Sequence, residues 1–336
     1  MITPISIGRH KIECPVYLAP MSGVSDLPFR RLAWRYGAGL VVSEMVACEA
    51  LANNSREMAT RAQGEGVGIH VVQLAGREEK WMAEGARIAA DSGADILDIN
   101  MGCPARKVTN GYSGSALMQD PDHALRLIEA TVAATDLPVC LKMRLGWDEN
   151  SLNAAEIAQR AESAGIQLVT IHGRTRNQFY KGKADWSAIR NVSDSVSIPV
   201  IANGDIVALE QVETVLELSR ADGVMIGRGA YGKPWFPGYV TSRLSVNQPP
   251  RPEPTRVEKQ ALAAEHYEAI LSHYGIRVGI SAARKHLGWY LDDANIRNAD
   301  LRKSIMTGTN PQTILKAIND AFAMAPETDE KLEFAA

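Results

Sequence analysis

Short apolar runs rich in β-branched residues alternate with longer amphipathic segments along the first two thirds of the chain. Each run has the length of a buried strand, and each longer segment repeats its apolar residues with a helical period. Eight strands are predicted, at residues 16–19, 40–43, 68–74, 96–100, 139–143, 168–172, 200–203 and 223–226. Helices are predicted between them, for example at 78–92, 121–135, 153–164 and 207–219. Asp120 and Pro121 have the residue types expected at an N-cap and a first helical position.

A strand followed by a helix, repeated eight times, predicts an α/β fold in which a parallel sheet closes into a (β/α)8 TIM barrel. An open, doubly wound sheet is the alternative, but eight repeats within about 215 residues favour closure. The alternation stops after Gly229, and residues 247–256 contain four prolines, which is typical of a stiff linker. Four helical patterns follow without strands, at 257–272, 278–291, 301–306 and 311–324. We therefore expect a barrel domain at 1–246 and a helical domain at 247–336.

Composition narrows the class of protein further. The chain has 336 residues, of which 46% are hydrophobic and 22% charged, so it is not intrinsically disordered. Its 36 Lys and Arg against 39 Asp and Glu give a net charge of −3, so a nucleic-acid site would have to be a local patch. No stretch reaches the roughly 18 apolar residues of a membrane span, and no targeting segment is evident. We expect a soluble monomer without a membrane partner.

The four cysteines, Cys14, Cys48, Cys103 and Cys140, are too far apart for a CxxC pair or a zinc site. We therefore expect no metal, and free thiols in a reducing cytoplasm. Cys103 differs from the others because it follows a predicted strand, between Gly102 and Pro104, in a polar loop rich in glycine and hydroxyl groups. A free cysteine is usually a buried, inert residue. In such a loop, a largely protonated thiol could instead donate a proton to carbon.

Catalytic groups of a TIM barrel lie where the strands end at the carboxyl face. The polar residues at those predicted ends include Ser22, Gln73, Asn100, Lys142, Arg144 and His172. The turns Asn203-Gly204-Asp205 and Gly227-Arg228-Gly229 follow the last two strands, where barrels commonly bind phosphate, although such turns also serve any tight bend. Lys142 could be a structural lysine, a Schiff-base nucleophile or a fixed charge beside a cofactor. With Gln73 and His172, it suits the ring of FMN.

Five sequence blocks together resemble the bacterial tRNA-dihydrouridine synthases, with the closest likeness to the B-type branch. They are Leu18-Ala-Pro20-Met21-Ser-Gly-Val-Ser-Asp26, Asp98-Ile-Asn100-Met-Gly-Cys103-Pro104-Ala-Arg106-Lys107, Leu141-Lys142-Met-Arg144-Leu-Gly-Trp147, Ile171-His172-Gly-Arg174-Thr and Asp222-Gly-Val-Met-Ile-Gly227-Arg228-Gly229. The blocks cover the barrel in order. Where the family pattern has a glycine- and alanine-rich stretch after the catalytic loop, this chain carries Tyr112.

The resemblance implies a flavoenzyme in which NADPH reduces FMN and the flavin passes hydride to C6 of a uridine in the tRNA D-loop. Cys103 would be the acid that protonates C5. The flavin contacts implied by the family are Pro20, Met21, Ser22, Gln73, Lys142, His172, Asn203, Gly204, Asp205, Gly227 and Arg228. Asn100 and Arg144 match residues that contact the uracil edge, and Tyr180 is a candidate stacking partner.

Cations for tRNA phosphates are expected in two places. Arg106, Lys107, Arg174, Arg176, Lys181 and Lys183 follow the fourth and sixth predicted strands. Residues 276–303 carry Arg277, Arg284, Lys285, Arg297, Arg302 and Lys303 against Asp292, Asp293 and Asp300. The alternative for the second group is an ordinary solvated helix face.

Three other functions are compatible with the same residues. A dihydroorotate-dehydrogenase-like enzyme would keep the flavin and act on a free pyrimidine, but it would not need the basic helical segment. A barrel could bind RNA or a phosphorylated ligand without redox chemistry, with Cys103 merely packed. A lyase could form a Schiff base on Lys142.

Overall fold

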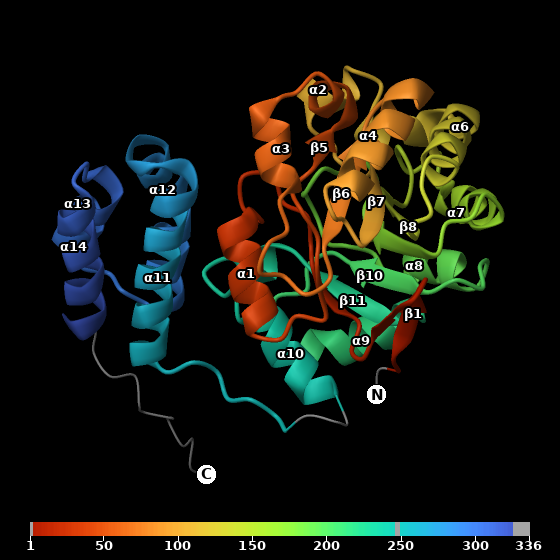
Figure 1. Cartoon of the computed structure of the whole chain (residues 1–336). Coiled ribbons are helices and arrows are strands. Elements are labelled where there is room, and N and C mark those ends of the chain that lie inside the picture. The colour runs from red at the N-terminus through yellow and green to blue at the C-terminus, as the bar shows by residue number, and fades with distance from the viewer. Residues whose placement is uncertain (1–2, 246–248, 325–336) are drawn as a thin grey trace, which may run out of the picture. The chain divides into compact units, whose positions relative to one another are not determined.

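The predicted strands lie side by side in one curved parallel sheet (Figure 1). A computed structural model describes residues 3–245 and 249–324. The sheet has the order β4-β3-β11-β10-β9-β8-β7-β6-β5. Its strands are β3 (Val16–Leu18), β4 (Leu40–Val41), β5 (Val46–Ala47), β6 (Val71–Ala75), β7 (Ile96–Met101), β8 (Val139–Arg144), β9 (Leu168–His172), β10 (Val200–Asn203) and β11 (Gly223–Ile226).

The two edges of this sheet meet, which closes the ring. A parallel bridge joins Val42, directly after β4, to Val71 at the start of β6, and Ser43 N donates to Val71 O at 3.0 Å. The second predicted strand, at 40–43, corresponds to β4 and the bridge at Val42, and β5, which was not predicted, belongs to the same position in an eight-membered ring. The predicted TIM barrel is confirmed, and the open, doubly wound alternative is wrong.

Helices cover the outside of the sheet (Figure 1). Those between β6 and β11 include α4 (Glu79–Asp91), α6 (Pro121–Val132), α7 (Ala154–Ser163) and α9 (Glu210–Ser219), each within three residues of its predicted bounds. Asp120 caps α6 as predicted, because its carboxylate accepts from His123 N at 3.0 Å and Pro121 opens the helix. The other barrel helices are α1 (Leu27–Arg35), α2 (Cys48–Ala52), α3 (Arg56–Ala62), α5 (Arg106–Thr109), α8 (Trp186–Ser193) and α10 (Phe236–Leu244), with the 3₁₀ turns η1 (Gly114–Gln119) and η2 (Arg228–Ala230).

The inward-facing side chains change from apolar to polar along the barrel axis. Alternate residues of a strand face the same side, and the first inward positions form an apolar cluster with Tyr17, Leu40, Ile96, Leu168 and Ile201. The next inward positions toward the carboxyl ends are polar, namely Gln73, Asp98, Asn100, Lys142, Thr170 and Asn203. Apolar side chains therefore fill the barrel interior at the amino ends of the strands. The polar side chains lie toward the carboxyl ends, at the mouth of the barrel.

A short hairpin that the sequence analysis missed packs at the amino end. Strands β1 (Ile5–Ile7) and β2 (His10–Ile12) pair antiparallel across a turn in which Gly8 has φ +55°. Ile5, Ile7 and Ile12 are buried in the apolar cluster inside the barrel. Burying an isoleucine side chain contributes about 1.5–3 kcal/mol. The alternation of isoleucines on either side of a glycine was the signal for this hairpin.

The chain divides into two compact units: Met1–Ala230 with Pro234–Pro252, and Tyr231–Lys233 with Glu253–Ala336. The predicted boundary between residues 246 and 247 lies outside the described residues. In the second unit, α11 (Arg256–Tyr274) packs against α12 (Ile276–Asp293) and α14 (Pro311–Met324), and α13 (Ala299–Thr307) packs against α12 and α14. These helices match the four predicted ones. Over the described ranges, no helix is both long and apolar enough to cross a membrane.

Two buried histidines make the helical unit sensitive to acid. Burial lowers the pKa of His266 to about 3, and burial with the charges of His266 and Lys285 lowers the pKa of His286 well below its usual value. In the unfolded chain both histidines are protonated below about pH 6.5. The unfolded state therefore binds more protons in acid, and stability is lost as the pH falls below that value.

We expect the melting temperature of the full chain to fall between pH 7 and pH 5, with each histidine contributing up to about 1.4 kcal/mol per pH unit. Thermal melts of the wild type and of His286→Leu, followed by circular dichroism, measure this. The variant should show a flatter pH dependence. An identical dependence in both proteins would show that His286 is not a source of the acid sensitivity.

Candidate functional site

The mouth of the barrel collects the polar residues that the sequence placed at strand ends. Asn100, Lys142, Arg144, His172 and Asn203 lie within β7–β10 near their carboxyl ends, and all except His172 are buried. The other expected cofactor residues follow β3, β10 and β11 or lie in β6, namely Pro20, Met21, Ser22, Gln73, Gly204, Asp205, Gly227 and Arg228. The parallel strands bring segments from across the sequence to one end of the barrel.

Asp205 holds two arginines at the β10 and β11 side of the mouth. Its carboxylate accepts from Arg174 Nη1 at 3.0 Å, from Arg228 Nη2 at 2.8 Å and from Ala184 N at 2.8 Å. Partial burial would raise the pKa of this carboxyl, but the hydrogen bonds from Arg174 and Ala184 and the two arginine charges outweigh it and lower the pKa. Asp205 has φ +55°, a backbone conformation that aspartate and asparagine tolerate better than most residues.

His172 is neutral at physiological pH. Partial burial of the ring, and then the charges of Lys142, Arg144, Arg174 and Arg228, lower its pKa well below the usual range. Arg174 Nη1 lies 3.3 Å from His172 Nε2. Since a guanidinium can only donate, Nε2 accepts and the ring carries its hydrogen on Nδ1. His172 thus offers an N–H donor for a ligand.

Lys142 and Asp98 are buried side chains within the barrel, and the charge of each affects the pKa of the other. Burial, and then the charge of Arg144, lower the pKa of Lys142 to about 8, while Asp98 and Cys103 act in the opposite direction. Burial raises the pKa of Asp98 to about 6, opposed by the hydrogen bond from Gln73 and by Lys142. Lys142 Nζ donates to Asn203 Oδ1 at 3.1 Å. An ammonium has three N–H donors, so Lys142 can also donate to a ligand.

Cys103 is partly exposed, whereas Cys14, Cys48 and Cys140 are buried. Its backbone carbonyl accepts from Ser115 N at 3.1 Å and Ser115 Oγ at 2.8 Å, and Gly114 packs closely against it with φ +60°. Tyr112, at the position where the family pattern has small residues, has φ +54° and is 75% exposed. The loop after β7 therefore folds back on Cys103 and carries an exposed aromatic ring.

Arg144 joins the Cys103 loop to the loop after β9. Its Nε donates to Gly102 O at 2.7 Å, and its Nη1 donates to Thr175 O at 2.8 Å and Phe179 O at 2.9 Å. The Tyr180 ring, 53% exposed, lies 5.5 Å from the Arg144 guanidinium and 5.3 Å from that of Arg228. Burial lowers the pKa of Arg144 to about 10, which leaves it charged at neutral pH.

The barrel cations that were expected to contact RNA phosphates differ in their exposure to solvent. Arg106, Lys181 and Lys183 are exposed, and the side chain of Lys107 lies outside the described part of the chain. Arg174 is only 1% exposed and is bound to Asp205, so its expected contact with the RNA backbone does not fit this position. Arg176 is partly buried, with its guanidinium 4.5 Å from the Trp147 ring and 4.7 Å from the Phe179 ring.

In the helical unit, neighbouring carboxylates neutralise some of the expected basic residues. Asp292 lies 2.9 Å from Arg302 and 3.9 Å from Arg297, and Asp293 binds Lys233 and Lys259. Arg284 is partly buried and donates to Gly308 O. Of the remaining cations, Arg277 and Lys303 are exposed and Lys285 is partly exposed.

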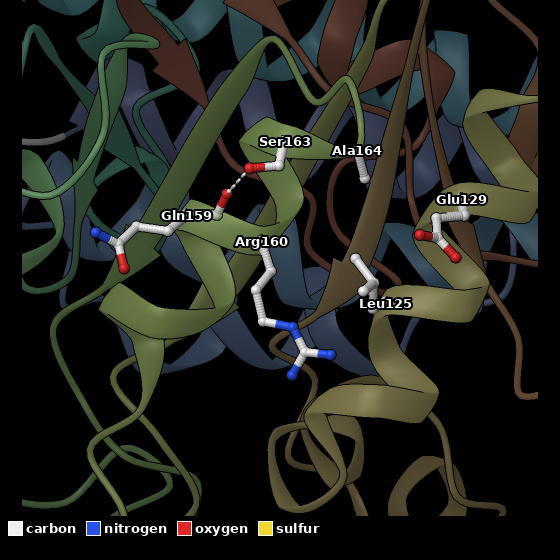
Figure 2. Close-up of a pocket in the computed structure, with 6 residues that line it drawn as sticks. All are labelled: Leu125, Glu129, Gln159, Arg160, Ser163 and Ala164. Carbon is white, nitrogen blue, oxygen red and sulfur yellow. Dashed lines mark hydrogen bonds between the residues drawn. The ribbon is translucent and has the colours of Figure 1, made fainter.

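A pocket on the outside of the barrel is unrelated to this chemistry. It lies between α6 and α7 and is lined by Leu125, Glu129, Gln159, Arg160, Ser163 and Ala164 (Figure 2). Residues 159–164 form the C-terminal end of α7. Because this helix runs back toward the amino ends of the strands, the pocket lies near that end of the barrel. The mouth described above, at the opposite ends of the strands, is the candidate site.

Replacing Asp205 by asparagine should destabilise the protein and weaken cofactor binding. The asparagine would keep the left-handed backbone but remove the charge that balances Arg174, and an unpaired buried charge costs about 3–5 kcal/mol. We expect the melting temperature to fall by several degrees, about 2–4 °C per kcal/mol for a large domain. Differential scanning calorimetry measures this, with Asp122→Asn on α6, an exposed partner of Arg160, as the control. Equal melting temperatures for Asp205→Asn and wild type would contradict the role assigned to this carboxylate.

The donor set of the mouth fits a flavin mononucleotide. Lys142 and His172 offer N–H donors to carbonyl and ring-nitrogen acceptors, and Arg228 with the turns after β10 and β11 offers charge and N–H groups to a phosphate. An added Cβ at Gly227 would lie 3.7 Å from Met21 Sδ, so a larger side chain there would cover a residue that is expected to face the cofactor. The mouth carries more positive than negative side chains, which suits an anionic ligand. The cations are Lys142, Arg144, Arg174 and Arg228, and the carboxylates are Asp98 and Asp205.

A TIM barrel with this mouth defines an enzyme of the flavin-dependent oxidoreductase class. The model of the family described as Dihydrouridine synthase (Dus) matches residues 17–326. The chain belongs to the dihydrouridine synthase family, which confirms the family that the sequence motifs indicated.

Individual relatives agree with this assignment. A "Probable tRNA-dihydrouridine synthase" of Rhizobium leguminosarum bv. phaseoli is 58% identical over 300 residues, 89% of this chain and 92% of that protein. The "tRNA-dihydrouridine synthase B" of Pasteurella multocida is 39% identical over 97% of this chain and 98% of its own. A solved 2-naphthoyl-CoA reductase structure shares the fold, with a TM-score of 0.56 and 14% identity over 71% of this chain and 51% of that one.

Asp98 is a residue of the mouth for which the sequence predicts no role, although it lies in one of the five family-like blocks. The structure places its carboxylate against Gln73 and near the charge of Lys142. The signal was present, because Asp98 precedes Asn100 by two residues in an otherwise apolar strand. The two side chains must therefore face the same side of the sheet.

Proposed function

We propose that this protein is an FMN-dependent tRNA-dihydrouridine synthase that uses NADPH to reduce the C5–C6 bond of a uridine in the tRNA D-loop. The observation that carries the proposal is the partly exposed Cys103 beside a mouth lined by Lys142, Arg144 and His172. Relatives that match nearly the whole chain are named tRNA-dihydrouridine synthases. In this assignment the barrel binds FMN and the helical domain from residue 247 onward binds tRNA.

Phosphate and ring contacts would come from different groups of residues at the mouth. The FMN phosphate would lie at the turns that contain Gly204 and Gly227, with Arg228 as its charged partner and Asp205 holding that arginine. The ring would lie over Pro20, Met21 and Ser22, and Gln73, Lys142, His172 and Asn203 would meet its polar edges. When bound in reduced form, the flavin supplies hydride to C6 of the uracil.

The protein's own residues supply the proton and the orientation. Cys103 donates the thiol proton to C5, and the positive charges of Lys142 and Arg144, which act on this sulfur, balance the thiolate that remains. Asn100 and Arg144 would hold the uracil edge, and Tyr180 offers an exposed ring for stacking. A uridine within a folded tRNA reaches the mouth only if it is flipped out of its stack.

Phosphate contacts outside the mouth would come from exposed cations. On the barrel these are Arg106, Lys181 and Lys183, with Lys107 proposed from its place in the sequence alone, whereas Arg174 supports the site from within through Asp205. A tRNA substrate also places the enzyme in the cytoplasm, where its four free thiols stay reduced.

The test uses the purified full-length protein and a tRNA transcript that lacks dihydrouridine. We expect a yellow protein that oxidises NADPH, and a transcript that gains two hydrogens at a D-loop uridine by mass spectrometry. Free uracil and orotate serve as control substrates. A colourless protein contradicts the flavin assignment, and reduction of a free pyrimidine in place of tRNA favours the metabolic dehydrogenase.

A further inference from the structure

Three side chains on β6 and β7 form a continuous hydrogen-bonded chain that ends at the backbone of Cys103. Gln73 and Asp98 are register partners on neighbouring strands, and Asn100 lies two residues further along β7. Gln73 Nε2 donates to Asp98 Oδ2 at 2.6 Å, and Asn100 Nδ2 donates to Gln73 Oε1 at 2.7 Å. Asn100 Oδ1 accepts from Cys103 N at 3.0 Å and from Gly102 N at 3.3 Å. We call Asp98, Gln73 and Asn100 the amide relay.

Both ends of the amide relay fix the same orientation for its two amide groups. A backbone N–H can only donate, so Asn100 must turn its oxygen toward Cys103 and its amino group toward Gln73. A carboxylate can only accept, so Gln73 must turn its amino group toward Asp98 and its oxygen toward Asn100. A flipped Gln73 would set two amino groups against each other and an oxygen against a carboxylate.

Burial makes this orientation matter. Gln73 is 1% exposed, Asp98 4% and Asn100 8%, so bulk water cannot replace a missing partner. A buried donor or acceptor without a partner costs about 1–3 kcal/mol, and a fully satisfied buried network holds its members in one arrangement. The amide relay therefore ties the loop after β7 to the barrel interior.

We propose that Asp98 is a positioning residue for the reduction: its carboxylate sets the orientation of Gln73 and Asn100 and thereby holds the loop that carries Cys103. Asp98 makes no direct contact with Cys103 and acts through the two amides. The inference rests on the proposed function, since it assigns Asp98 a part in presenting the proton donor.

The first test compares two substitutions of Asp98 in the full-length holoenzyme. Asp98→Leu removes the acceptor, and we expect kcat for uridine reduction to fall at least about tenfold while KM for tRNA stays within about twofold. Cys103 should react with iodoacetamide at least about threefold faster, because its loop opens more often. Asp98→Asn keeps one acceptor oxygen and should lie between Asp98→Leu and wild type. Asp95→Asn is the control, because Asp95 accepts from His70 N just before β7 and lies outside the amide relay.

The second test moves the negative charge from position 98 to position 73. It keeps an unbroken chain of hydrogen bonds through the amide relay. Gln73→Glu alone sets two carboxylates against each other and should change the alkylation rate of Cys103 more than about threefold. In the double variant with Asp98→Asn, the new amide at position 98 can donate to the new carboxylate at position 73, and that carboxylate can still accept from Asn100. The alkylation rate should then return to within about twofold of the wild type. Alkylation is the measurement here because Gln73 is expected to contact the flavin.

The outcomes separate this inference from the proposed function. If wild-type holoenzyme reduces no uridine in tRNA, the proposed function fails, and the alkylation rates still decide whether the amide relay holds the loop. If wild type is active and folded Asp98→Leu keeps both its kcat and its alkylation rate, the inference is wrong. A double variant no closer to wild type than Gln73→Glu overturns it as well, even if Asp98→Leu fails to fold.

Discussion

Cys103→Ala should stop uridine reduction while leaving the flavin bound. The thiol is the proton donor in the proposed reaction, and general acid catalysis contributes about 10²–10⁴-fold, so we expect a loss of about a thousandfold or more. The flavin contacts lie on other strand ends, so the absorbance spectrum of the holoenzyme and its oxidation of NADPH should stay close to wild type. Dihydrouridine formation in a tRNA transcript, measured by mass spectrometry, gives the rate.

The matched control is Cys14→Ala, which removes a thiol that is buried and packed near Thr241 in the barrel unit. This variant should keep wild-type turnover. Iodoacetamide should modify Cys103 first, because the other three cysteines are no more than 4% exposed. Turnover at the wild-type rate in Cys103→Ala would remove the acid role from this residue.

Reversing three charges of the helical unit should weaken tRNA binding about a hundredfold near 0.15 M salt. The substitutions are Arg277→Glu, Lys285→Glu and Lys303→Glu, chosen because they lie at exposed or partly exposed positions without a carboxylate that neutralises them among the described ion pairs. Each lost phosphate contact lowers the slope of log K against log salt by about one. Filter binding of tRNA across a salt series measures both the affinity and the slope.

A control for this experiment is Arg87→Glu on α4, which reverses an exposed arginine that pairs with Glu84 on the barrel surface. Its tRNA affinity should stay within about twofold of the wild type, because a single surface pair contributes little. NADPH oxidation by the triple variant should also be unchanged. Equal affinity and slope for the triple variant and wild type would show that these positions are not the tRNA surface.

Local patterns in the sequence predicted most of the barrel and of its mouth. Strand periodicity placed Lys142, His172 and Asn203 at the carboxyl ends of parallel strands, and all parallel strands end on the same face of a barrel. The Asp120–Pro121 helix start was also predicted, because capping depends on residues only a few positions apart. The hairpin at Ile5–Ile12 was missed because each of its strands has only three residues, although isoleucines alternate on either side of Gly8.

The site was predicted less completely where a contact joins distant parts of the chain. Arg174 was expected to face RNA because it follows the sixth predicted strand among other cations, yet it is buried against Asp205, 31 residues further on. Arg302 and Arg297 were counted toward a basic surface, although Asp292 lies within ion-pair distance of both. Asp98 had no predicted role because its partner Gln73 lies on another strand.

The sequence by itself determined the strand–helix alternation, the polar set at the strand ends and the identity of Cys103 as the exceptional cysteine. These follow from short-range periodicity and from residue type. Only the tertiary structure decided that Val42 and Val71 close the ring, that Arg174 is held within the protein and that Asp98 reaches Cys103 through two amides. Burial and hydrogen-bond direction are set by neighbours in space, and a linear pattern does not record which strands will supply those neighbours.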